Sequence, residues 1–573
     1  MKKTVISLVL ILALLASVCP AAFAEGKTLR EVEMPYYFMS EENRVDAPVY
    51  FISDSDVPYV SLRTWAEIME VLFGGEGKKY AMDYSIEDNV GVLTREDGYT
   101  ARFDTEESTI SFIDYDAFVR PNDERVIIDL LSVDNPAPDG DKALFRRTDG
   151  SYERYGESLL LDLDAYGIPM YTDGEDVYVP LQTMSDFLLA NRYVNVFYNG
   201  QAVIIAEYNG LLGDDGELSE IGKLAYSVEK GARSQEMADF SYAELCLALD
   251  YQYGLKESHG FRSFDLLCKQ AGLEEALRST DPNIADEALW ELINFHLDDL
   301  HSSFTCVSPL SAQETQDRLN GQKKGRAETA FFVQLDRYTD ARVAAYPDGM
   351  PHYEEVGNTA YIMFDSFSST PLDISYYETA PTADVNDTIG ILLYAYSQIM
   401  REGSPIENVV LDLSCNLGGD VDTAVFTICT FLGDGYVSAT NTMTGAMSVG
   451  EYQIDLNLDG RFDEKDRGLT TKNLYCLTSP ASFSCGNLVP NVFKNSNMVT
   501  LLGRTSGGGS CIVQPLSTAY GTVLQTSGCT RLAFTKNGSF YDIDQGAVPD
   551  YVLSRPESFY DRAGLTDYIN NLK

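Results

Sequence analysis

Strand-like and helix-like segments alternate from residue 353 to the end of the chain, and this alternation most constrains the fold. Short apolar runs typical of strands occur at Thr359–Phe364, Val409–Leu413, Leu474–Thr478 and Met498–Leu502. Between them, apolar residues recur at helical spacing in Asp387–Arg401, Asp422–Leu432 and Cys485–Phe493. Strands that alternate with helices favour a sheet covered by helices. We therefore predict an α/β domain over residues 353–573.

The first part of the chain carries a weak internal duplication. Val57–Trp65 is echoed by Val177–Met184, and each copy is a short strand entering an amphipathic helix. Further strand-like runs follow each copy, which predicts a β-rich α+β module over residues 25–210. Residues 211–352 have apolar residues at three-to-four spacing and are predicted to be helical.

The extreme N-terminus has the pattern of a secretory signal peptide. Lys2 and Lys3 precede an apolar run from Val5 to Val18, and Ala22-Phe23-Ala24 supplies small residues for cleavage. The run is too short to cross ~30 Å of hydrocarbon, and no later apolar run is longer. We therefore predict a signal peptide at residues 1–24, no transmembrane span, and a secreted, extracellular protein that can associate with the cell surface.

The charge balance excludes one class of partner. Lys and Arg number 42 against 87 Asp and Glu, a formal net charge of −45 at pH 7. Such a surface repels phosphate backbones, so nucleic acid is not an expected partner. No motif for an organic cofactor was found either.

Ser482 lies in a run that predicts a strand, a small-residue turn and a helix (Leu474–Asn487). A serine at such a corner projects its hydroxyl from the sheet edge, close to helix N-terminal amides that stabilise negative charge. A helix N-cap is the alternative role for a serine here, and Ser484 would serve it equally well.

A second strand-to-helix turn contains two glycines. Val409–Leu413 reads as a buried strand, and Gly418-Gly419 lead into the helix around Ala424–Phe431. A Gly-Gly turn lets backbone amides approach a ligand, as an oxyanion hole requires. An ordinary strand-to-helix turn is the alternative.

Together these segments resemble the family of C-terminal processing (tail-specific) serine peptidases. The family's ordered motifs correspond to Asp412–Gly419, Ser479–Ser484, Gly503–Gly508 and Gly546–Asp550. The resemblance implies a crotonase-like (ββα superhelix) core, with Ser482 as nucleophile and oxyanion amides from Gly418, Gly419 and Phe483.

The general base differs from that of the lysine-dependent branch of the family. Where that branch has its lysine, this chain has Ser506–Ser510, and no lysine lies between Lys494 and Lys536. The segment Leu297–Phe304 resembles the tricorn-like branch, which works through Ser and His. The resemblance implies His301 as base, with His296 as the other candidate. It also implies an orienting carboxylate before the late Pro-Asp, for which Asp544 is the first choice and Asp542 the second.

Residues 455–466 have the oxygen spacing of a calcium loop. Asp455, Asn457, Asp459, Asp463 and Asp466 occupy positions 1, 3, 5, 9 and 12, Gly460 occupies position 6, and Arg461 at position 7 offers its carbonyl. An acidic surface turn is the alternative. We predict a structural Ca²⁺ site inserted in the 353–573 domain.

The duplicated module resembles the N-terminal domain of some copper amine oxidases, which implies an accessory role, such as contact with the cell wall. The sequence as a whole predicts an exported serine endopeptidase that acts on a peptide or protein. A catalytically inactive peptide- or cell-wall-binding protein on the same scaffold is the alternative, because Ser414 stands where the family has Arg and the lysine is missing.

Overall fold

The computed structural model describes residues 17–19 and 27–572, except 74–80, 96–97, 120–125, 129–143, 208–209, 214–216, 323, 369–373 and 537–538. The predicted signal peptide lies outside these residues, apart from the short strand β1 (Ser17–Cys19). In the described part of the chain, no helix is long and apolar enough to cross a membrane.

The C-terminal part is built on a largely parallel sheet, as the alternation of segments predicts. The antiparallel edge strand β16 pairs with β17, and β17, β18, β21, β22 and β27 follow in parallel. Their bounds are β16 (Tyr353–Val356), β17 (Thr359–Met363), β18 (Asn408–Asp412), β21 (Asn473–Thr478), β22 (Val499–Gly503) and β27 (Tyr551–Val552). Because the strands are parallel, the loops at their carboxyl ends gather along one edge of the sheet.

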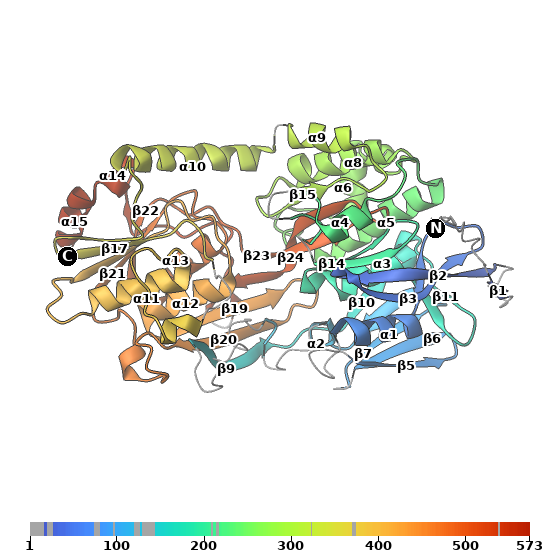
Figure 1. The fold of residues 1–573 in the computed structure, drawn as a ribbon, viewed down its shortest axis with the longest axis horizontal. Helices are drawn as coiled ribbons and strands as arrows, with labels where there is room; N and C mark the ends of the chain where they lie inside the picture. Colours follow the sequence, from blue (N-terminus) through green and yellow to red (C-terminus); the bar gives the residue numbers. More distant parts are fainter. Residues whose placement is uncertain are drawn as a thin grey trace, which may run out of the picture.

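Helices cover both faces of this sheet (Figure 1). Alternate strand residues, such as Ile362 and Val409, pack against α11 (Thr388–Ile399), α12 (Val421–Leu432) and α13 (Cys485–Ser496). Their neighbours Tyr361 and Val410 pack on the other face with residues of α10 (Arg326–Ala345), α14 (Glu557–Tyr560) and α15 (Arg562–Asn570). The period of two along each strand thus supplies two apolar cores.

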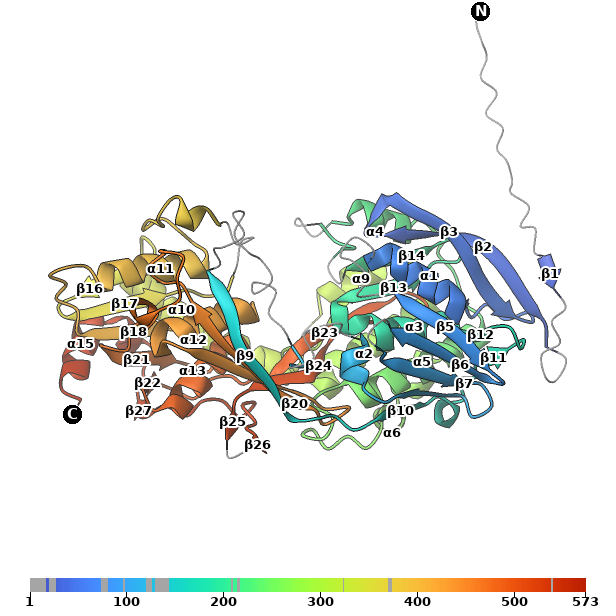
Figure 2. The ribbon, with the colours of Figure 1, turned by 90° about the horizontal axis from the view of Figure 1, so that it is seen from below.

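A second sheet crosses the domain boundaries expected from the sequence. It runs β15-β24-β19-β20-β9, with β23 also paired to β24. Its strands are β9 (Phe145–Arg154), β15 (Ser303–Cys306), β19 (Gly435–Asn441), β20 (Met447–Ile454), β23 (Cys511–Ser517) and β24 (Val523–Ala533). β9 comes from the 25–210 module and β15 from the 211–352 segment, so boundaries at 210 and 352 do not separate independent sheets. Figure 2 shows β9 against β20, with β23 and β24 bridging the two halves of the molecule.

The two copies of the internal duplication lie side by side. β4 (Tyr59–Ser61) and β12 (Val177–Pro180) pair antiparallel, Val60 opposite Val179, and lead into α1 (Leu62–Phe73) and α3 (Leu181–Leu188). The sheet that contains them runs β11 (Tyr171–Thr172), β12, β4, β3 (Ser40–Ile52), β2 (Leu29–Phe38), β14 (Val203–Glu207), β13 (Val194–Tyr198). A second sheet of the module runs β10 (Leu159–Asp162), β8 (Thr109–Phe112), β7 (Thr100–Asp104), β6 (Val90–Arg95), β5 (Met82–Glu87).

Residues 211–352 are mainly helical, as predicted. They contain α4 (Glu220–Ala225), α5 (Gln235–Gln252), α6 (Phe264–Ala271), α7 (Glu274–Leu277), α8 (Pro282–Glu291), a π-helical turn (Leu292–Leu297), α9 (Gln313–Asn320) and α10. Figure 1 shows α10 reaching from α9, on the side of the helical segment, to α14 in the α/β half. The long helix therefore connects the half that carries His301 to the half that carries Ser482 and Ser484.

Candidate active site

Ser484 occupies a strained corner between β21 and α13. It has φ 55° and ψ −122° and immediately precedes the first residue of the helix. A non-glycine residue held at positive φ stores ~1–3 kcal/mol of strain and often marks a functional site. A sharp strand-to-helix turn of this kind exposes the hydroxyl of a nucleophilic serine. Ser484 lines a cavity of about 960 Å³ together with His301.

Ser482, the nucleophile expected from the sequence, faces away from that cavity. Its side chain is fully buried: Oγ donates to the carbonyl of Leu413 at 2.6 Å and accepts the amide of Ser479 at 2.9 Å. Ser482 is also absent from the residues that line the cavity. The prediction for Ser482 is thus corrected, because this hydroxyl ties the corner to the end of β18 and cannot meet a substrate.

Cys485, the next residue, is a less suitable nucleophile. Its thiol donates to the carbonyl of Gly419 at 3.1 Å, and burial raises the pKa of the thiol to about 12. Since the reactive form of cysteine is the thiolate, Cys485 is unreactive near neutral pH.

Two of the three predicted oxyanion amides are already used inside the protein. The Gly418 amide donates to Oδ1 of Asn416 at 2.9 Å, and the Phe483 amide donates to the Asn416 carbonyl at 3.0 Å. By contrast, the amides of Gly419 and Cys485 have no hydrogen-bond acceptor among the described residues, and both residues line the cavity. The arrangement therefore favours Gly419 and Cys485 as oxyanion donors and corrects the roles of Gly418 and Phe483.

Glycine is required at this turn by close approach as well as by conformation. Gly418 and Gly419 have φ of 101° and 130°. A Cβ on Gly418 would lie 2.5 Å from Cβ of Ser484, and one on Gly419 would lie 2.1 Å from the carbonyl oxygen of Phe367. The Gly-Gly turn therefore packs directly against the corner that carries Ser484.

His301 reaches the cavity from the loop that follows the π-helical turn. Oδ1 of Asp299 accepts the backbone amides of His301 and Ser302, at 3.0 and 2.9 Å, which fixes the loop. The His301 side chain is largely buried, and its ring packs on that of Phe483 with centroids 4.6 Å apart. Burial lowers the pKa of His301, against the opposing effect of Asp299 and Asp544, so the imidazole is neutral near pH 7. No hydrogen bond joins Ser484 to His301 among the described residues.

Asp544 and Asp542 both pair with Arg531. The guanidinium donates to Asp544 at 2.7 Å and to Asp542 at 2.6 Å. Asp544 also accepts the amide of Ser510 at 2.7 Å, and both aspartates line a smaller cavity, of about 260 Å³, beside His301. Of the two, only Asp544 affects the pKa of His301.

His296 lies apart from this arrangement. Its Nε2 is 3.9 Å from a carboxylate oxygen of Glu291, and neither residue lines the two cavities. The structure thus brings His301, and not His296, to the cavity that Ser484 lines.

Comparison with known proteins bears on this site. Residues 358–553 match peptidase family S41. A curated protein of Chlamydia pneumoniae, CPj1016/CpB1054, is 30% identical over 104 residues, which are 18% of this chain and 17% of that protein.

Solved structures give two further likenesses. Mature CPAF complexed with lactacystin is 12% identical, with a TM-score of 0.37, over 59% of this chain and 97% of that one. The photosystem II D1 C-terminal processing protease is 18% identical, with a TM-score of 0.27, over 36% of this chain and 46% of that one. The chain thus spans less than half of the D1 protease and less than a fifth of the curated relative.

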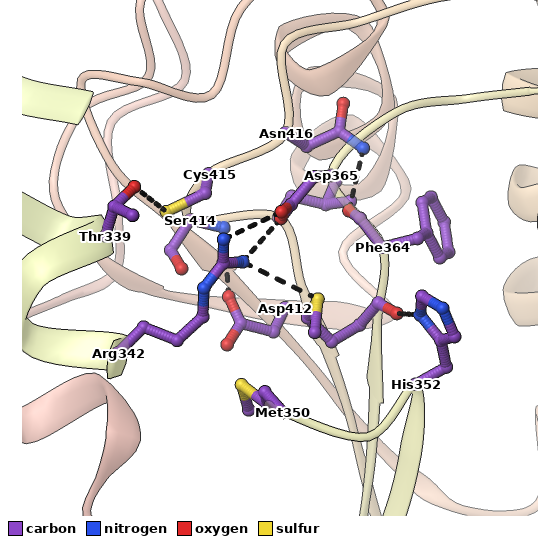
Figure 3. A network of polar contacts seen from close by, with 12 residues as sticks. Thr339, Arg342, Met350, His352, Phe364, Asp365, Asp412, Ser414, Cys415 and Asn416 are labelled. Carbon is purple, nitrogen blue, oxygen red and sulfur yellow. Dashed lines mark hydrogen bonds and ion pairs between the residues drawn. The ribbon is translucent and has the colours of Figure 1, made fainter. Parts of the chain in front are cut away.

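Residues just before the Gly418-Gly419 turn, within the segment 358–553 that matches the family model, belong to a polar network (Figure 3). Asp412, at the end of β18, accepts the amide of Ser414 at 2.9 Å and binds Arg562 at 2.7 Å in a buried ion pair. Asn416 donates to the carbonyl of Phe364 at 3.0 Å. These bonds fix the turn before a substrate arrives, which is what an oxyanion hole needs.

The predicted calcium loop, Asp455–Asp466, forms a closed turn between β20 and β21. Asp455 accepts the amide of Gly460 at 2.7 Å and the hydroxyl of Tyr377 at 2.9 Å, while Asp466 accepts the amide of Leu456 at 2.9 Å. Asp459 forms an ion pair with Lys465. In the described part of the chain, no group of three or more His, Cys, Asp or Glu side chains is arranged to hold a metal. Ca²⁺ binding by this loop stays a prediction.

Proposed function

We propose that the protein hydrolyses peptide bonds through an acyl-enzyme on Ser484, with His301 as general base. The observation that carries this proposal is the strained corner of Ser484, which opens into the same cavity as His301. A peptidase needs a nucleophile, a base and oxyanion donors around one space, and all three types of group line this cavity.

The first step transfers a proton as the acyl bond forms. His301 takes the proton of the Ser484 hydroxyl while Oγ attacks the substrate carbonyl, and the amides of Gly419 and Cys485 stabilise the resulting oxyanion. His301 then returns the proton to the leaving amine. Water, activated by His301, attacks the acyl-enzyme and releases the second product together with free Ser484. The neutral state of His301, which burial favours, is the state that the first step requires.

Asp544 is the carboxylate that best suits the third role. It is near enough to raise the pKa of His301, and its bonds with Arg531 and Ser510 fix its position. To stabilise the imidazolium of His301, the Asp544 carboxylate must move closer to it during the reaction. Such a movement is common, because catalytic hydrogen bonds are often long before substrate binds.

One observation favours the alternative of an inactive binding protein. Among the described residues, no hydrogen bond joins Ser484 to His301. An inactive binding protein would use the cavity to hold a peptide without cleaving it. Reaction with a serine-directed fluorophosphonate probe separates the two functions, because the probe reports an activated serine.

The two nearby serines supply a matched experiment. The parent protein and Ser482→Ala are expected to label, whereas Ser484→Ala and His301→Ala are expected not to. All four proteins are first compared by circular dichroism, so that loss of labelling is not loss of folding. A folded Ser484→Ala that labels like the parent would contradict the assignment of the nucleophile, and a folded parent that does not label would support the inactive alternative.

The remaining parts of the proposal concern location and architecture. We propose that the chain is exported after cleavage of residues 1–24 and acts on peptides or proteins outside the cell. The proposal includes a crotonase-like core for residues 353–573. It also includes an accessory role for residues 25–210, which resemble copper amine oxidase N-terminal-like domains, with the cell wall as the contacted surface. Mass spectrometry of the protein from culture medium tests cleavage, because a mature chain would begin at Glu25. Wall contact is tested by pull-down with isolated cell walls, in which the bait is the chain 25–573 carrying Ser484→Ala so that it cannot cleave wall proteins.

A further inference from the structure

Phe483 lies between the candidate base and the long helix α10. Its ring centroid is 4.6 Å from that of His301 and 5.8 Å from that of Phe331, which belongs to α10. The ring is tilted by 53° to the imidazole and by 67° to Phe331. Phe483 therefore packs on the imidazole and is itself contacted by an aromatic residue of α10.

The position of the Phe483 ring is well determined. Its amide donates to the Asn416 carbonyl, and the next residue, Ser484, donates its amide to the carbonyl of Gly508 at 2.9 Å. A Cβ on Gly509 would lie 2.6 Å from the ring, so the glycine makes room for it. The backbone that holds the nucleophile thus also holds the ring that contacts the base.

Helix α10 is anchored in both halves of the molecule. At its start, Oδ1 of Asp298 accepts the amide of Ala327 at 2.9 Å, and Asp298 lies three residues before His301. Towards its end, Tyr338 is fully buried against Phe559, and Arg342 forms a bidentate ion pair with Asp365 at 2.6 and 2.8 Å. Most of the rest of the helix is exposed, so these anchors and Phe331 fix its position.

We propose that Phe483 and Phe331 are positioning residues for catalysis, through which α10 holds the imidazole of His301 in place for Ser484. This inference rests on the proposed function, since it needs His301 to act as base. The physical reason is that a base must be held within hydrogen-bond reach of the proton it accepts, and a misplacement near 1 Å costs about 10²-fold in rate. No side-chain hydrogen bond fixes the His301 ring among the described residues, so packing must do so.

Phe483 also controls how far the base is shielded from water. Burial is the main influence on the pKa of His301, and the ring of Phe483 supplies part of it. Loss of the ring therefore raises the pKa of His301 towards its ordinary value. The charged or titratable groups that line the two cavities with His301 are Arg192, Tyr193, Glu207, His259, Asp299, Lys324, Glu328, Asp420, Asp422, Cys485, Cys511, Asp542 and Asp544. Arg531 pairs with Asp542 and Asp544. Replacement of Phe483 or Phe331 removes none of these groups.

The test is the rate of fluorophosphonate labelling as a function of pH. Phe483→Ala is expected to label about tenfold more slowly or worse, and the acid limb of its pH profile is expected to move to higher pH. Phe331→Ala is expected to slow labelling in the same direction by a smaller factor. Phe483→Leu keeps apolar bulk against the imidazole and is expected to restore the acid limb towards that of the parent.

Val333→Ala is the matched control on α10. Val333 is about half exposed and lines neither cavity, so this variant is expected to label at the parental rate. Parental rates and acid limbs in both phenylalanine variants would overturn the inference while leaving the proposed function intact. A slower rate with an unmoved acid limb in Phe483→Ala would also overturn it, since that is the signature of a merely structural role. If Phe483→Ala does not fold, Phe331→Ala carries the test, and a parent that does not label overturns inference and function together.

Discussion

Ser482 and Ser484 are two residues apart, yet their hydroxyls lie in opposite environments. Oγ of Ser482 donates to the Leu413 carbonyl in the interior, whereas Ser484, at φ 55°, lines the cavity shared with His301. The turn between β21 and α13 produces this difference, because Ser484 has a positive φ and Ser482 does not. In the proposed function, Ser482 therefore has a structural role and Ser484 the catalytic one.

Ser482→Ala is therefore expected to reduce stability but not reactivity. It removes a buried hydroxyl with two hydrogen bonds, a loss of about 1–3 kcal/mol in the free energy of unfolding. Chemical denaturation of the parent and the variant measures the change, and fluorophosphonate labelling supplies the second readout. Unchanged stability together with abolished labelling would reverse the assignment of the two serines.

Asn416 is expected to matter for catalysis without touching the substrate. Its side chain accepts the Gly418 amide and its carbonyl accepts the Phe483 amide, so it shapes the turn that presents Gly419. Asn416→Ala should slow labelling about tenfold or more, because oxyanion donors act only when preorganised. Asn416→Asp keeps an acceptor for Gly418 and should retain more activity. Equal labelling rates in the alanine variant and the parent would contradict this role.

The pH dependence of labelling should have its acid limb below pH 6.5, the ordinary pKa of histidine. A base acts when it is neutral, so the rate rises with pH through the pKa of His301, and burial lowers that pKa. Labelling rates between pH 4 and 9 locate the limb. A limb clearly above pH 6.5 would mean that another group, or an exposed His301, is the base.

Two buried carboxyl groups are expected to make the fold less stable as pH rises. Asp186 on α3 and Glu244 on α5 are almost completely buried, and burial raises the pKa of each well above its ordinary value. Each group stays protonated in the folded chain after the unfolded chain has lost the proton. Their contribution to the free energy of unfolding is thus fully present below the pKa of ~4 that they have in the unfolded chain. It is lost as pH rises towards the pKa of the folded chain.

Asp186→Asn supplies the test of this pair. The amide can still accept the bond that Gln182 donates to Oδ1, but it cannot ionise. The variant should be more stable than the parent at pH 8 by about 1 kcal/mol or more, and no more stable at pH 4. Melting temperatures across this range measure the effect. Parallel curves for parent and variant would show that the pair does not titrate as expected.

Calcium binding by the loop Asp455–Asp466 is tested by thermal melting. If the site forms, Ca²⁺ at ten times Kd stabilises the fold by about 1.4 kcal/mol, and chelator reverses the rise in Tm. Asp459→Ala should abolish the response, because it removes the ligand at position 5. A Tm that is the same with millimolar Ca²⁺ and with chelator would identify the loop as an acidic surface turn held by its own amides.

The sequence by itself determined the order and type of the main elements. The apolar runs at Val409–Leu413 and Leu474–Thr478 became the parallel strands β18 and β21, and the mixed α/β fold is confirmed. Strand and helix periodicity depends on neighbouring residues, so it can be read along the chain. The same local patterns predicted the Gly418-Gly419 turn and the serine corner, whereas His301 was implied by the resemblance of Leu297–Phe304 to the tricorn-like branch.

Only the tertiary structure decided which of these groups meet. Ser482 and Ser484 look alike in sequence, and the choice between them came from the positive φ of Ser484 and from the Leu413 carbonyl, 69 residues before Ser482. Gly419 and Cys485 became the proposed oxyanion donors because Asn416 already accepts the amides of Gly418 and Phe483. The sheet that joins β9, β15 and β20 crosses boundaries drawn from composition, since pairing between distant strands leaves no local signal. Periodicity fixes elements, but the directions of hydroxyls and amides depend on contacts between residues far apart in the chain.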